Sequence, residues 1–339
     1  MASAADTWDA ERSALLGKRI SDLELRLHGS PLEQLVDRLY AELRDRELSF
    51  LPPVYLSDEW GCPDSTPVIG VPFYLADQRL MRIEEERAAG VETPDESMRF
   101  LRHEAGHAYN YAYRLYDRPE WRRLFGPYSR PYRERYHADP FSRAYVRHIL
   151  GWYAQKHPDE DFAETFAVWL TPEAEWRRQY EGWPALEKLE YVDRVMAEVK
   201  GEPPVVLTDV EEDHLPVGAM HYTVEQHYHE LEHALPIEDE RFFDGDLLTI
   251  FTSSTDQMGS ASEFLRSHRR ELVSRIGYWS GEGATVVGSF VDFLTARAEQ
   301  LGLGLRQLEA STLIELTAFG TAVMMNYRYT DNIGRPDTL

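Results

Sequence analysis

The stretch HEAGH at residues 103–107 and the stretch HELEH at residues 229–233 both follow the pattern H-E-x-x-H. On a helix, two histidines four residues apart lie on one face and can bind the same zinc ion. The glutamate that follows the first histidine then points toward a water molecule held on the metal. Because both stretches satisfy this pattern, only the surrounding sequence can tell which of them is a metal site.

The two stretches differ in the helices to which they would belong. HEAGH lies on a helix whose opposite face carries an apolar stripe, so His103 and His107 point away from that stripe, toward a possible cleft. The stripe consists of Leu101, Ala105, Ala108, Ala112 and Leu115. HELEH lies among acidic residues and ends only three residues before Pro236, so it falls in the last turn of a short helix. The helix dipole favours histidine at that end on structural grounds alone. This comparison favours HEAGH as a site and HELEH as a solvated helix face.

A third ligand distinguishes the two stretches further. Catalytic zinc has three protein ligands and an open position for water. Residues 157–170 read HPDEDFAETFAVWL and place Glu160 and Glu164 on one face of a predicted helix. The nearest counterpart after HELEH, ELTAF at residues 315–319, has no acid at its fifth position. We therefore predict one zinc ion at HEAGH; a chance match or a lapsed site is the alternative.

The composition restricts the classes of protein to which the chain can belong. With 36 basic and 59 acidic residues, its formal net charge of -23 opposes general binding to nucleic acid. No apolar run approaches the ~20 residues of a membrane span, and the N-terminal residues lack the apolar region of a signal peptide. Cys62 is the single cysteine, which excludes an internal disulfide. We expect a cytoplasmic protein that binds neither nucleic acid nor a membrane, and its oligomeric state stays open.

Helix and strand signals predict an α+β fold that is mostly α. The sequences SPLE (30–33) and TPDE (93–96) resemble capping boxes that open helices. Short β-rich segments at 53–60 and 66–77 predict a small sheet. Helices are predicted at 31–46, 94–117, 140–156, 158–170, 172–199, 223–235, 260–275, 284–301 and 306–328. A Pro-, Gly- and acid-rich linker at 201–218 is predicted to separate a domain at 1–200 from a smaller all-α domain at 219–339.

Seven arginines alternate with aromatic residues between Arg114 and Arg135. One interpretation is a site for an anionic ligand or a substrate carboxylate. The other, which we favour from sequence alone, is a solvated face with aromatic packing.

The two motifs together resemble those of the gluzincin metallopeptidases, in which H-E-x-x-H is followed by E-x-x-A-E. They are most similar to a bacterial group of zinc-binding metallopeptidases whose second motif reads much like HPDEDFAET, and distantly similar to the catalytic domain of anthrax lethal factor. The resemblance is strong over residues 98–172 and does not extend past 201–218. It implies a zincin-like domain, in which a small sheet and two ligand-bearing helices surround the metal.

The resemblance also implies a role for each motif residue. His103, His107 and Glu160 would bind zinc, and Glu104 would be the general base. Glu164 would orient a ligand histidine. Two further residues lie near the second motif. Tyr153, seven residues before Glu160, matches a tyrosine that faces the metal in such enzymes, with core packing as its alternative. His157 is interpreted as a helix-start residue.

These residues predict a zinc-dependent peptidase that hydrolyses an amide bond of a peptide or protein. In this prediction, Glu104 takes a proton from the metal-activated water. One alternative is a non-catalytic zincin-fold module that binds a protein partner. Another is a hydrolase of a non-peptide amide, with the same site. Glu104 favours the enzyme, because a structural zinc site has no use for a general base.

Overall fold

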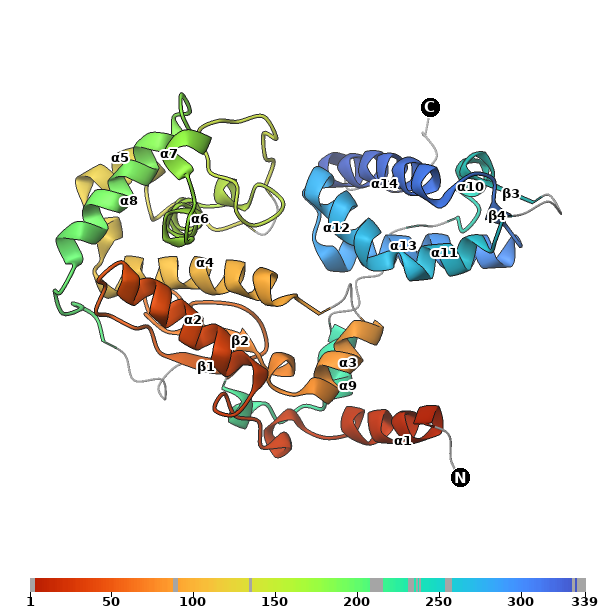
Figure 1. Cartoon of the computed structure of the whole chain (residues 1–339), viewed down its shortest axis with the longest axis horizontal. Coiled ribbons are helices and arrows are strands. Elements are labelled where there is room, and N and C mark those ends of the chain that lie inside the picture. Colours follow the sequence, from red (N-terminus) through yellow and green to blue (C-terminus); the bar gives the residue numbers. More distant parts are fainter. Residues whose placement is uncertain are drawn as a thin grey trace. The chain divides into compact units, whose positions relative to one another are not determined.

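The computed structural model describes residues 4–87, 91–133, 136–207, 216–230, 235, 237, 239–253, 258–330 and 333. It is mostly helical with two two-stranded sheets, which confirms the predicted α+β class (Figure 1). Contacts divide the chain into two compact units, Met1–Glu86 with Val91–Tyr228, and Arg87–Gly90 with His229–Leu339. No helix among the described residues is long and apolar enough to cross a membrane.

The first unit contains HEAGH and the second motif, each on its own long helix. Its α-helices are α1 (Ala4–Leu16), α2 (Pro31–Asp45), α3 (Gln78–Arg87), α4 (Pro94–Ala112), α5 (Pro119–Phe125), α6 (Pro158–Leu170), α7 (Trp176–Gln179), α8 (Ala185–Val199) and α9 (Val224–Glu230). Its 3-10 turns are η1 (Ile20–Leu23), η2 (Phe73–Ala76), η3 (Leu115–Asp117), η4 (Tyr153–Gln155) and η5 (Val217–Ala219). Its strands are β1 (Val54–Ser57) and β2 (Ile69–Pro72).

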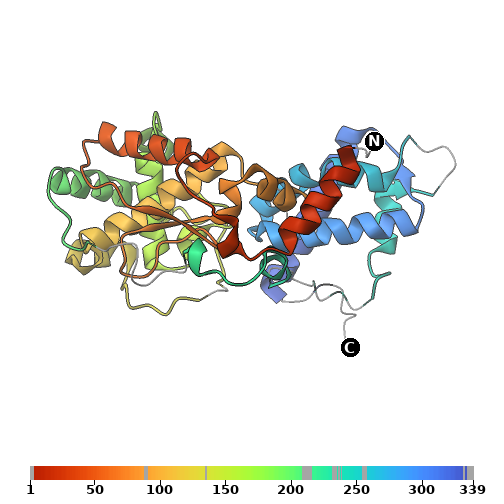
Figure 2. The same cartoon turned by 90° about the horizontal axis from the view of Figure 1, so that it is seen from below.

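Helix α4 is the centre of this unit. Figure 1 shows it with α6 on one side and with α2 and the small sheet on the other. From Leu101 to Ala112 every residue of α4 is buried, polar ones included. The strands β1 and β2 pair in parallel, with Val54 opposite Ile69 and Ser57 opposite Pro72, and Figure 2 shows them running together. The core therefore surrounds the helix that carries HEAGH.

The predicted capping boxes have different outcomes. Thr93 accepts a hydrogen bond from the Glu96 backbone N–H, and Glu96 accepts one from the Thr93 backbone, so the box at the start of α4 is confirmed. Ser30 makes no cap hydrogen bond, because its hydroxyl donates backward to the Leu27 carbonyl and Glu33 binds Gly29 instead. Helix α2 still begins where it was predicted, with Pro31 at its first position.

A buried ion pair joins α4 to α2. The Arg102 guanidinium donates two hydrogen bonds to the Glu42 carboxylate, at 2.6 and 2.7 Å. Both side chains are less than a tenth exposed, so each charge depends on the other for stabilisation. Because Arg102 immediately precedes His103, this pair also fixes the rotation of α4 about its axis.

The helix predicted at 140–156 is wrong. The chain over 140–152 is irregular, and only Tyr153–Gln155 form a 3-10 turn. Long-range hydrogen bonds hold this segment: Arg143 and Ala144 give their carbonyls to Ala185 and Lys188, and Ile149 donates its N–H to Glu164. These partners take backbone groups that a helix would have used locally. Gly151 and Trp152 also have positive φ angles, which end any helix there.

The helix predicted at 172–199 is two helices, α7 and α8, because Gly182 with φ +74° and Pro184 lie between them. Helix 94–117 likewise ends at Ala112 and continues as η3 and α5, with the left-handed Arg114 at the break.

The second unit is small and mostly helical. It contains α10 (Asp244–Ile250), α11 (Ala261–Ser267), α12 (Arg269–Ser280), α13 (Ala284–Gln300) and α14 (Glu309–Thr330). It also holds a short antiparallel pair, β3 (Phe251–Thr252) and β4 (Gly304–Leu305), which the prediction of an all-α domain omits. Its core is an apolar cluster around Phe251 and Phe290.

Residues 217–228 pack in the first unit, although the sequence predicts that most of them belong to the C-terminal domain. Ile20 donates its N–H to the Tyr222 carbonyl, and Val224 donates to Lys18. Met220 and Val224 are fully buried in the first core. The first unit therefore extends to Tyr228, beyond the predicted linker at 201–218. Residues 208–215 of that linker lie outside the described residues.

Helices α4 and α6 are in close backbone contact at Gly106. A Cβ atom built on Gly106 would lie 2.7 Å from the Ala163 Cα atom and 2.9 Å from the Ala163 carbonyl oxygen. Both neighbours are backbone atoms, so only a shift of one helix would make room. The glycine inside HEAGH is thus required by helix packing.

We expect Gly106→Ala to lower the free energy of unfolding by about 1–3 kcal/mol, the usual cost of overpacking a core. In an open helix the same change would instead stabilise by ~1 kcal/mol. Gly245→Ala in α10, where a Cβ meets no atom within 4 Å, is the matched control and should leave stability unchanged or raised. Chemical denaturation followed by circular dichroism measures both, and equal effects of the two substitutions would contradict this packing argument.

Candidate metal centre

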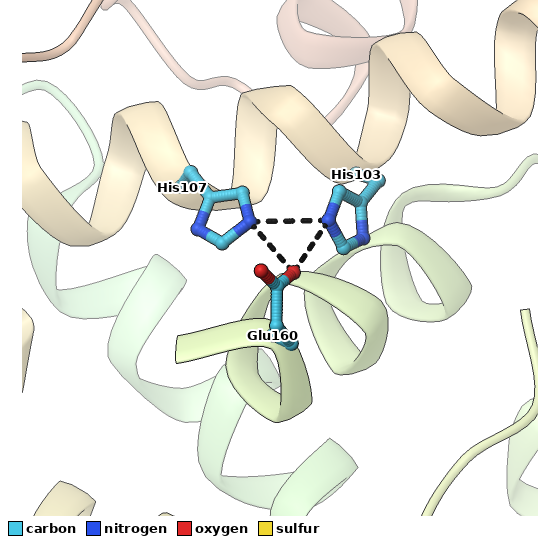
Figure 3. Close-up of side chains that lie close together, drawn as sticks. All are labelled: His103, His107 and Glu160. Atoms are coloured by element: carbon cyan, nitrogen blue, oxygen red, sulfur yellow. Dashed lines mark hydrogen bonds and ion pairs between the residues drawn. The ribbon is translucent and has the colours of Figure 1, made fainter. Parts of the chain in front are cut away.

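Three donor atoms from α4 and α6 converge at one point. The Glu160 Oε2 atom lies 3.0 Å from His103 Nε2 and 3.1 Å from His107 Nε2, and the two Nε2 atoms are 3.1 Å apart (Figure 3). The histidines are one turn apart on α4, and Glu160 lies in the first turn of α6. All three side chains are buried. The predicted ligand residues are therefore brought together.

The donor set and its dimensions fit a zinc ion. Zinc in proteins prefers tetrahedral sites of histidine nitrogen and carboxylate oxygen, with bonds of about 2.0–2.2 Å. Neighbouring ligand atoms of such a tetrahedron are ~3.3 Å apart by geometry, close to the sides of the triangle seen here. Three ligands would leave a fourth position open to the cavity described below.

A carboxylate holds the outer nitrogen of each histidine. Glu164 Oε1 lies 2.9 Å from His103 Nδ1, and Asp159 Oδ2 lies 2.9 Å from His107 Nδ1. Each contact favours a proton on Nδ1 and leaves the Nε2 lone pair directed at the centre. Glu164 has the position that its implied role requires. Asp159 was not predicted, although its place beside Glu160 in the first turn of α6 was a usable signal.

Both of these carboxylates are themselves held in place. Asp159 accepts hydrogen bonds from the Asn110 amide at 2.6 Å and from the Tyr111 hydroxyl at 2.5 Å. The second oxygen of Glu164 accepts the Ile149 N–H at 2.9 Å. Through Glu164, the irregular segment 140–152 is therefore tied to the metal centre.

The centre stabilises positive charge. Burial by itself would lower the pKa of His103, but Glu160 and Glu164 raise it to about 9. The pKa of His107 is likewise raised well above its usual value despite burial, by Asp159 and Glu160. Burial would raise the pKa of Glu160, yet the two histidines hold it well below its usual range. A divalent cation in the same place would replace the protons that this field attracts.

Glu104 faces the cavity beside the three ligand residues. No other described residue donates a hydrogen bond to its carboxylate. Burial raises the pKa of Glu104, and the neighbouring histidines partly oppose this. A carboxylate with a pKa shifted toward neutrality is suited to accept a proton from water.

A cavity of about 720 Å³ opens onto these residues. The Tyr132 hydroxyl donates to Glu160 Oε1 at 2.7 Å, and the Tyr153 hydroxyl lies 3.3 Å from that of Tyr132. The Tyr153 ring centroid is 5.6 Å from that of His103. Tyr153 thus lines the cavity. The contact of Tyr132 with Glu160 was not predicted.

The two interpretations of the arginine- and aromatic-rich stretch between Arg114 and Arg135 apply to different parts of it. Trp121 and Phe125 are buried in the core, and the arginines from 114 to 123 form exposed ion pairs. Tyr128, Arg130 and Tyr132 instead line the cavity. Arg135 lies outside the described residues. The packing interpretation therefore holds for the first half, and the second half belongs to the site.

His157 has the predicted place at the start of α6. Its Nδ1 accepts the Asp159 N–H, and its Nε2 faces the Arg130 carbonyl at 2.7 Å. Of the second H-E-x-x-H stretch, His229 is exposed, and residues 231–233 lie outside the described residues.

Comparison with known families gives a match over the segment that contains these residues. Residues 82–176 match the model of a family described as "Putative zinc-binding metallo-peptidase". This segment covers α4, α6 and all the residues between them, and so includes both histidines and Glu160. No curated protein matches the chain, and no solved structure matches it. The family match and the buried donor group together support a zinc site of peptidase type.

We expect the dialysed wild-type chain to hold about one zinc ion, and His103→Ala to lose it because one of the three donors is removed. His229→Ala is the matched control, and it should retain the metal. Elemental analysis of each variant measures the ratio. A wild-type chain without zinc, or loss of zinc only in His229→Ala, would refute the site.

Zinc uptake should depend on pH. The pKa of His103 is raised to about 9 and that of His107 is also raised, so zinc must displace protons from this pair at pH 7. Zinc binding at pH 7 should therefore release protons, and the apparent affinity should rise as the pH increases toward 9. Calorimetry in buffers of different ionisation enthalpy measures the released protons, and a binding heat independent of buffer would contradict the expectation.

Proposed function

We propose that the first unit is a zincin-like peptidase that hydrolyses an amide bond of a peptide or protein. The observation that carries this proposal is the arrangement of His103, His107 and Glu160 around one point, with Glu104 beside them at the wall of an open cavity. The match of residues 82–176 to a zinc-binding metallopeptidase family supports it.

The side chains have distinct parts in this reaction. His103, His107 and Glu160 would hold the zinc ion, which when bound would acidify a water molecule and polarise the scissile carbonyl. The Glu104 carboxylate would accept a proton from the water and deliver it to the leaving amine. Its raised pKa suits both halves of this transfer, because the group has to take up a proton and then release it.

Tyr153 is proposed to donate a hydrogen bond to the oxyanion that forms at the carbonyl. Burial raises the pKa of its hydroxyl, and so do the charge of Glu160 and the hydrogen bond with the Tyr132 hydroxyl. The hydroxyl therefore stays protonated and remains a donor at neutral pH. Donors of this kind contribute about 3–4 kcal/mol in comparable oxyanion sites.

The alternative of a structural zinc site in a partner-binding module is less well supported. Structural zinc is closed by four protein ligands. Here the described residues supply a group of three, and the same residues line a cavity large enough for a peptide segment.

We expect Glu104→Gln to reduce peptide hydrolysis by about 10²–10⁴-fold, because the general base is lost. The variant should keep its zinc, since Glu104 is not among the three donors. Tyr153→Phe should lower kcat and leave zinc content unchanged. Hydrolysis of a mixed peptide library, followed by mass spectrometry, measures activity.

His229→Ala serves as the control for this comparison and should cleave like the wild type. A zinc-loaded wild type that cleaves no peptide in the library, or a Glu104→Gln variant as active as the wild type, would refute the proposed mechanism. Cleavage of small amides alone would favour the non-peptide hydrolase.

A further inference from the structure

The two carboxylate oxygens of Glu160 have different partners. Oε2 lies 3.0 Å from His103 Nε2 and 3.1 Å from His107 Nε2, where the three donor atoms converge. Oε1 instead accepts a hydrogen bond of 2.7 Å from the Tyr132 hydroxyl. This length is typical of a hydroxyl that donates to an ionised carboxylate. One oxygen therefore faces the metal position, and the other is held by Tyr132.

Tyr132 reaches Glu160 from outside the core. Its side chain is 49% exposed and lies in irregular chain after α5, whereas Glu160 is only 4% exposed. Burial of apolar surface therefore contributes little to holding the Tyr132 ring. Two contacts at the start of α6 hold it instead: the His157 ring centroid lies 5.4 Å from that of Tyr132, and Lys156 Nζ lies 4.4 Å from it. The hydroxyl is thus placed by the same end of the helix that carries Glu160.

A second hydroxyl continues this arrangement. The Tyr153 Oη atom lies 3.3 Å from the Tyr132 Oη atom. A tyrosine hydroxyl has a single hydrogen, and that of Tyr132 is donated to Glu160. Tyr153 is therefore the donor between the two hydroxyls. This bond is longer than the usual range of about 2.5–3.0 Å and is correspondingly weak, so the position of Glu160 depends on Tyr132 and not on Tyr153.

The hydrogen bond to Oε1 affects how Glu160 can bind a metal. A carboxylate can bind a cation through one oxygen or through both. With both oxygens on zinc, Glu160 would take up the position that a catalytic site leaves open for water. That arrangement is disfavoured here, because Oε1 would have to give up its charge-assisted bond with Tyr132.

We propose that Tyr132 is a positioning residue of the metal centre, whose hydroxyl keeps Glu160 a one-oxygen ligand and so keeps the fourth position of the zinc ion open. This inference rests on the proposed function, because it assigns a role at the same site. Tyr132 is not among the three donors and acts on the metal through Glu160.

Three substitutions, each removing a single hydroxyl, test this role. Tyr132→Phe loses the bond to Glu160 and keeps the ring with its contacts. Tyr153→Phe loses the second hydroxyl and leaves the bond between Tyr132 and Glu160 in place. Tyr40→Phe is the matched control, because its hydroxyl also donates at 2.7 Å, to the Pro52 carbonyl, and Tyr40 does not line the metal cavity. Circular dichroism and thermal unfolding should show that each variant is folded.

Two measurements on the full-length protein report on the metal itself. Competition with a chromophoric chelator gives the zinc affinity. Replacement of zinc by Co²⁺ gives an absorption spectrum that reports the coordination number, because four-coordinate Co²⁺ absorbs visible light more strongly than five-coordinate Co²⁺.

We expect Tyr132→Phe to bind zinc about 10–100-fold more weakly, the usual effect of losing a group that holds a metal ligand. Its cobalt absorption should also be weaker than that of the wild type, since the second oxygen of Glu160 is then free to join the metal. Tyr153→Phe and Tyr40→Phe should match the wild type in both measurements.

An unchanged cobalt spectrum in Tyr132→Phe overturns the inference even if zinc binds more weakly, because a merely loosened site would lower the affinity alone. The same spectral change in Tyr153→Phe or Tyr40→Phe also overturns it. A wild type that binds no zinc rejects the metal site and this inference together. Failure of the proposed function alone is a different result: Tyr132→Phe changes the affinity and the spectrum as expected, while the zinc-loaded wild type cleaves no peptide.

Discussion

The close approach of α4 and α6 at Gly106 is the constraint on which the metal centre depends. The Cα and carbonyl of Ala163 leave no room for a Cβ at that position. With the two helices this close, donor atoms from both come within 3.1 Å of one another. The buried pair Arg102–Glu42 also holds α4 against α2. Helix packing therefore sets the dimensions of the site before any metal contributes energy.

Electrostatics then determine what this site can hold. The carboxyl groups of Glu104, Asp159, Glu160 and Glu164 surround two histidine rings, all largely removed from water. Such a group is unstable without compensating positive charge. The pKa values of His103 and His107 are raised for this reason, because bound protons supply compensating charge when no metal does. A divalent cation supplies the same compensation and uses the Nε2 lone pairs that Asp159 and Glu164 direct toward it.

The sequence predicted those parts of the site that follow from local periodicity. Spacing of four residues on a helix placed His103 with His107, and also Glu160 with Glu164, on common faces. What it missed depends on contacts between distant residues. Asp159 reaches His107 only because α6 crosses α4, and the segment 140–152 is irregular because Ala185, Lys188 and Glu164 take its backbone groups. Gly151 and Trp152 both have positive φ angles. The sequence carries no clear signal of such an angle at the tryptophan.

The segment between the two motifs also contributes contacts to the metal centre. It crosses the start of α6 and contacts it repeatedly: Arg130 through His157, and Tyr132 through Glu160. A peptidase needs its substrate held in a fixed position relative to the metal, because misplacement of the reacting group by even 1 Å costs rate. In the proposed function, cavity residues that are anchored to the helix carrying a metal ligand would meet that need. The same contacts account for the tyrosines of this stretch, because Tyr128 and Tyr132 line the metal cavity.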